Sequence, residues 1–69
     1  MNLFVNDIVE SISDKVTTGE KFQITNIKTI DGNLHAIITN IRDKNSEFTV
    51  ALSVLEDKNR FKIVKKFWR

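Results

Sequence analysis

Apolar residues near the start of the chain recur at helical spacing. Steps of three, one, three and four residues place five branched side chains on one helix face: Val5, Ile8, Val9, Ile12 and Val16. The pattern predicts an N-terminal helix over residues 3–16, ending at Thr17-Thr18-Gly19, where Gly19 suits a left-handed cap.

From residue 20 the apolar period changes from helical to alternating. Turn signals recur in three tripeptides, Asp31-Gly32-Asn33, Asp43-Lys44-Asn45 and Asp57-Lys58-Asn59. The spacing predicts a four-stranded antiparallel meander over residues 21–30, 34–42, 47–55 and 60–68. The expected fold class is therefore α+β, with the N-terminal helix followed by a strongly bent, barrel-like sheet.

Two details predict that this sheet bends and has two partly apolar faces. Phe22 and Ile24 are out of phase with Ile27, which indicates a bulge near Thr25-Asn26. A second set of apolar residues falls on the opposite face: Ile37, Ile41, Ala51, Leu55 and Val64. One helix covers only one face, so the other is covered by sheet closure or a second copy, or stays exposed.

The last segment fits two structures. Alternation places Phe61, Ile63 and Phe67 on one side of a strand, whereas Phe61, Val64 and Trp68 also fit helical steps. We favour the strand and leave a short basic amphipathic helix open.

A short N-terminal helix followed by bent strands is similar to the arrangement in Sm-like RNA-binding proteins. The likeness implies a small barrel. Asp31-Gly32-Asn33 is the sole candidate match to the turn glycines of that family, and Asp57-Lys58-Asn59-Arg60 departs from its motif. No binding residue is carried over from it.

Composition limits the chain to one small domain, residues 1–69. It is 41% hydrophobic and 29% charged, which predicts a folded domain rather than a disordered chain, and it has no cysteine to form a disulfide. Its apolar runs are too short to cross a membrane, and its start does not resemble a secretory signal. We expect a cytoplasmic protein supported by homodimerisation. Ile, Lys and Asn make up 24 of 69 residues, which is compatible with an AT-rich bacterial or phage gene.

Charge is the most informative feature for function. From residue 58 onward the chain carries six bases and no acid, with aromatic residues between them. Such a segment attracts phosphates, and its aromatic rings can stack on bases. The predicted nucleic-acid-binding residues are Lys58, Arg60, Lys62, Lys65, Lys66, Trp68 and Arg69. On a strand, Arg60, Lys62, Lys66 and Trp68 share one face.

Two other interpretations of this segment stay open. The lysines protect an edge strand from aggregation, or the protein docks on a protein partner or inhibits it through a sheet face or edge. The expected function is a non-enzymatic binding module that contacts nucleic acid, with the protein-interaction module as the alternative.

The remaining candidate residues predict no catalytic or metal chemistry. His35 is the single histidine, lacks a nucleophile motif beside it, and is expected to be structural or on the surface. Asp7, Glu10 and Asp14 form an acidic stripe, which we expect to be a solvated helix face. No enzyme activity, cofactor or metal is predicted.

Overall fold

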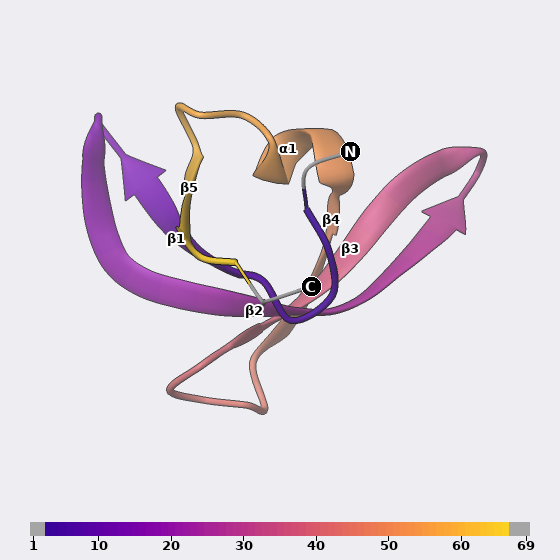
Figure 1. Ribbon diagram of the computed structural model, residues 1–69, viewed down its shortest axis with the longest axis horizontal. Helices are drawn as coiled ribbons and strands as arrows, with labels where there is room; N and C mark the ends of the chain where they lie inside the picture. Colours follow the sequence, from indigo (N-terminus) through magenta and orange to yellow (C-terminus); the bar gives the residue numbers. More distant parts are fainter. Residues whose placement is uncertain (1–2, 67–69) are drawn as a thin grey trace.

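The computed structural model describes residues 3–66 and contains one five-stranded antiparallel sheet and one short helix (Figure 1). The elements in chain order are β1 (Ile8–Ser13), β2 (Val16–Ile30), β3 (Asn33–Asn40), β4 (Glu47–Ala51), α1 (Leu52–Leu55) and β5 (Phe61–Lys65). The order across the sheet is β4-β3-β2-β1-β5, so β4 and β5 are its edges. Figure 1 shows that β2 curves strongly and that α1 lies inside the curve.

The predicted N-terminal helix is wrong. Residues of that segment form β1 and the start of β2, and the chain reverses at Asp14-Lys15, both with positive φ. Val9 is fully buried while its neighbour Ile8 is only half-buried, as alternation in a strand requires. The segment is rich in β-branched residues, which lower helix propensity and favour strands, and short isolated helices are marginal in water. The likeness to Sm-like proteins loses its main support, because it depended on this helix.

The four-stranded meander is also wrong. The predicted third strand, residues 47–55, ends at Ala51 and continues as α1. Helical spacing there buries both Leu52 and Leu55, whereas strand alternation would have paired Leu52 with Val54. The last strand then crosses the sheet and pairs with β1 instead of β4.

Several local predictions are confirmed. The antiparallel sheet is present, and β2 and β3 are joined at Asp31-Gly32, whose positive φ values of 50° and 80° suit a tight hairpin. The pairing of β2 with β3 shifts between Ile24 and Asn26, which places the predicted bulge at Thr25. The last segment is a strand over Phe61–Lys65, and Phe67 lies outside the described residues.

The two Asp-Lys-Asn tripeptides form the same turn. The carboxylate of Asp43 accepts a bond of 3.1 Å from the N–H of Asn45, and that of Asp57 accepts one of 2.9 Å from Asn59. An aspartate that bonds a backbone N–H two residues onward is a recurrent turn-forming element. These tripeptides therefore set both the β3–β4 loop and the approach to β5.

The core lies inside the curve of the sheet. Its buried apolar residues come from the N-terminal arm, three central strands and α1: Leu3, Val9, Ile24, Ala36, Ile38, Leu52 and Leu55. Phe22 extends this core, with its ring 5.9 Å from that of Phe48 and 6.5 Å from that of Phe61, both edge-to-face. No helix within residues 3–66 is long and apolar enough to cross a membrane.

Candidate functional site

A bulge in β5 decides which lysines share a face. Ile8 of β1 pairs with Lys65, and the next residue, Val9, pairs with Ile63, so Val64 is the extra residue. Lys62 pairs with Glu10, which is two residues from Ile8 on the same strand. Lys62 and Lys65 therefore lie on one face, although their spacing of three would separate them on a regular strand.

This face is the outer one, opposite the core. Glu10 pairs with Lys62 on one side and with Lys21 of β2 on the other, which forms a cross-strand row of two lysines around one carboxylate. The Glu10 carboxylate also accepts a bond of 2.9 Å from the Gly19 N–H. A second row runs from Lys65 through Ile8 to Gln23. The outer face thus presents Lys21, Lys62 and Lys65 close together.

A hollow of about 480 Å³ adjoins these lysines. Its walls come from the outer face and from the β3–β4 loop, and include Ile8, Gln23, Thr39, Asn40 and Lys44. The loop is held against β2 by a bond of 3.1 Å from the Ile41 N–H to the Lys21 carbonyl. The hollow therefore brings side-chain amides and a hydroxyl beside positive charge.

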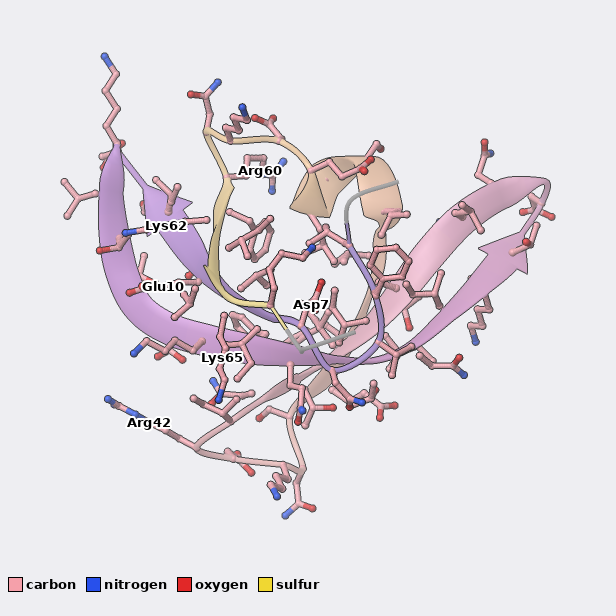
Figure 2. All side chains as sticks on the ribbon, viewed as in Figure 1. Asp7, Glu10, Arg42, Arg60, Lys62 and Lys65 are labelled. Carbon is pink, nitrogen blue, oxygen red and sulfur yellow. The ribbon has the colours of Figure 1, made fainter. Side chains whose placement is uncertain are left out.

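Figure 2 shows Asp7 inside the curve of β2, with Lys65 and Arg42 extending on the opposite side. We call Lys21, Arg42, Lys44, Lys62 and Lys65 the outer basic cluster. Within residues 3–66, none of Lys21, Lys62 and Lys65 forms an ion pair with an acid. Their ammonium groups are therefore available to a ligand.

Lys66 lies elsewhere, and the predicted common face of Arg60, Lys62 and Lys66 is wrong. Its Nζ is 3.1 Å from Oδ2 of Asp7 and 5.6 Å from the centre of the Phe4 ring. The bulge at Val64 causes this, because it turns the residues after it by one position. Lys66 serves the fold here, through an ion pair with a buried carboxylate.

The other predicted residues are spread along the molecule. Lys58 and Arg60 are exposed and belong to the turn before β5, where the Arg60 carbonyl accepts a bond of 2.8 Å from the Ile12 N–H. Trp68 and Arg69 lie outside the described residues, so their part in binding stays a prediction.

Sequence reasoning missed one group of residues and misplaced another. Lys21, Arg42 and Lys44 precede the basic segment and join it only through strand pairing and the β3–β4 loop. The acidic stripe was also wrong, because Asp7 is fully buried, Glu10 is on β1 and Asp14 is in a turn. The sequence held a signal for Lys21. It directly precedes Phe22, so in a strand it falls on the face opposite Phe22 and Ile24.

Comparison with known proteins found no relatives. No protein-family model matches the chain, and neither a curated protein nor a solved structure is significantly similar to it. The functional argument therefore depends on the geometry described above.

His35 lies on β3, half-buried, with its Nδ1 3.0 Å from the Asn33 carbonyl oxygen. Among the residues that the structure describes, no group of three His, Cys, Asp or Glu side chains is placed to hold a metal ion.

Proposed function

We propose that this protein is a small non-enzymatic module that binds nucleic acid through the outer basic cluster. The observation that carries the proposal is the bulge at Val64, which brings Lys62 and Lys65 onto the face that already holds Lys21. Three ammonium groups on one sheet face, none of which forms an ion pair within residues 3–66, provide positive charge that attracts a phosphate backbone. This differs from a basic tail, because the spacing of the charges is fixed by strand pairing.

The hollow beside these lysines supports the same role. Gln23 and Thr39 supply an amide and a hydroxyl group of the kind that contact phosphate and sugar oxygens, and Lys44 adds a charge beside them. The four aromatic residues of the described chain, Phe4, Phe22, Phe48 and Phe61, lie off this face, in contact with Lys66 or with one another. The described residues therefore contact the sugar-phosphate backbone of the nucleic acid. Base stacking by Trp68 is a separate proposal.

The test is a salt titration of affinity for duplex DNA and for single-stranded RNA. Phosphate contacts from the five cations of the outer basic cluster predict that log affinity falls against log salt with a slope of about −4 to −5 on duplex DNA. Changing Lys21 and Lys65 together to Gln should reduce the magnitude of that slope by about 2. Lys28→Gln is the control, because Lys28 is a lysine of the same strand, β2, but lies near the β2–β3 hairpin. A slope near zero for the unmodified protein contradicts the proposal.

Two further expectations accompany this function. A cytoplasmic location suits a nucleic-acid-binding role, and a homodimer would double the number of phosphate contacts. Light scattering on the purified protein, with and without DNA, tests the homodimer. A mass of 8.0 kDa at all concentrations would contradict it.

A further inference from the structure

A second hollow lies on the other side of β5 and is lined by a different set of residues. This cleft has a volume of about 440 Å³ and lies between β5, the loop from α1 and the N-terminal arm. Most of its lining is apolar, including Leu3, Phe61 and Ile63, and its charged residues are Glu56, Lys58 and Lys62. A concave apolar site with a few charged groups is typical of a binding site. Ile63 is 42% exposed there, so apolar surface faces solvent.

The cleft follows the open edge of β5. Phe61, Lys62 and Ile63 all line it, although consecutive residues of a strand point to opposite faces. The cleft therefore reaches the edge of β5, and its lining by Ile12 shows that it also extends over the strand toward β1. β5 is the last strand in the sheet order, so no strand of residues 3–66 pairs with that edge.

Backbone groups on this edge are oriented for pairing. The Arg60 carbonyl bonds to Ile12 of β1, and hydrogen-bonding direction alternates along an antiparallel strand. The backbone groups of Phe61 and Ile63 therefore point away from β1. In agreement, the Phe61 N–H bonds at 3.0 Å to the Asp57 carbonyl instead of to β1. The N–H and C=O of Ile63 face the cleft side of the strand.

Charge determines what this edge can accept. Lys58 and Lys62 border the cleft, and Lys65 follows on the same strand, against the single acid Glu56. A second copy of β5 would add its own Lys62 and Lys65 to an edge that already carries these lysines and Lys58, and this concentration of like charge disfavours self-pairing. An acidic strand would meet the lysines with complementary charge. The edge therefore favours an acidic segment over a second copy of this chain.

We propose that the β5 edge and its cleft bind an extended segment of a partner protein in which large apolar residues alternate with acidic ones. The segment pairs with the Ile63 backbone as a sixth strand, its apolar side chains enter the cleft, and its carboxylates meet Lys58 and Lys62. This site is separate from the outer basic cluster, and Lys62 is the one residue that borders both.

The probe is a blocked, fluorophore-labelled heptapeptide of alternating Glu and Leu, used at concentrations where it is monomeric. Three control peptides vary one property each: Lys in place of Glu, the same residues in two blocks, and N-methylation of the central backbone amides. We expect the alternating Glu-Leu peptide to bind at least about tenfold more tightly than any control, measured by fluorescence anisotropy. Amide NMR shifts should change at Phe61 and Ile63 and stay constant at β4.

Variants of the protein locate the site. Ile63→Lys should weaken binding at least about tenfold by placing a charge in the apolar cleft, while Leu34→Lys should leave it unchanged. Leu34 is a matched control because it is similarly exposed, at 46%, and lies beside the β2–β3 hairpin. Lys58→Glu changes a residue in an exposed turn, so this test does not require the fold to tolerate a change at Ile63. It should weaken binding of the Glu-Leu peptide and strengthen binding of the Lys-Leu peptide.

Each other result overturns the proposal. Equal binding by the block peptide would show nonspecific apolar contact, and equal binding by the N-methylated peptide would show that no strand is added. Shifts at β4 would move the site to the opposite edge, and no binding by any peptide would remove it. None of these results affects the salt dependence of nucleic-acid binding, which is measured with Lys21 and Lys65 variants.

Discussion

Lys66 and Asp7 form an ion pair that joins the end of β5 to the turn before β1. Their Nζ and Oδ2 atoms are 3.1 Å apart, and the Asp7 side chain is fully buried while that of Lys66 is 42% exposed. The same carboxylate oxygen accepts a bond of 3.0 Å from the Phe4 N–H, and the Asp7 carbonyl accepts one of 2.9 Å from the Ile24 N–H. One acidic residue thus connects the N-terminal arm, the central strand β2 and the last strand.

The first prediction concerns this pair. Asp7→Asn should lower the free energy of unfolding by about 2 kcal/mol, because it removes charge-assisted hydrogen bonds from a buried site. A double-mutant cycle with Lys66→Met should give a coupling of at least about 1 kcal/mol. The same cycle with Lys28→Met is the control and should give a coupling near zero, since Lys28 pairs with His35 far from Asp7. Equal coupling in both cycles, measured by urea denaturation, would contradict a direct interaction.

The second prediction uses the carboxylate between two lysines of the outer basic cluster. Glu10→Gln should tighten binding to duplex DNA by about threefold at low salt, because it removes a negative charge beside the phosphate contacts. The amide oxygen can still accept the Gly19 N–H, so the local backbone is retained. The gain should disappear at high salt, where such charges are screened. Weaker binding with unchanged stability would place the DNA on another face.

The third prediction concerns the two hairpin turns. Lys15 has a φ of 67°, a conformation that costs a residue with a side chain about 1–2 kcal/mol. Lys15→Gly should therefore raise stability by about 0.5–1 kcal/mol after the greater flexibility of glycine is deducted. Gly32→Ala should lower stability by about 1 kcal/mol, although no atom lies within 4 Å of the added Cβ. Thermal unfolding of both variants measures the two changes in stability. Changes of the same sign would contradict the turn geometry.

The fourth prediction separates α1 from the strand expected there. Leu55→Ala should lower stability by about 2–4 kcal/mol, because Leu55 is 2% exposed and packs with Leu52 at helical spacing. Val54→Ala should cost about 1 kcal/mol or less, since Val54 is only half-buried. On a continuous strand the order would reverse, because Val54 would share the buried face with Leu52. Chemical denaturation of the two variants decides between the two structures.

Local signals in the sequence were reliable where a turn or a bulge has its own chemistry. Asp31-Gly32 specified a hairpin because glycine accepts a positive φ, and the phase change near Thr25 specified a bulge because alternation cannot cross it unaltered. The same logic failed for the turn at Asp14-Lys15. Neither residue is a glycine, so the hairpin that replaced the predicted helix had no recognisable signal.

The candidate site was predictable only in part. Positive charge near the end of the chain pointed to Lys62 and Lys65, which the structure places together. Lys66 belongs to the same run of charge but reaches inward to Asp7. The extra residue Val64 places Lys65 on the outer face and Lys66 on the inner one. This effect depends on the pairing of β5 with β1.

The amino-acid sequence alone determined that this chain forms a bent antiparallel sheet with basic charge concentrated on its last segment, because apolar alternation, turn residues and charge are local properties. Only the tertiary structure decided that β5 pairs with β1, that Asp7 is buried, and that Lys21 joins Lys62 and Lys65. These outcomes depend on contacts between residues far apart in the chain, where burial of the whole core outweighs the helical spacing of Val5, Ile8 and Ile12.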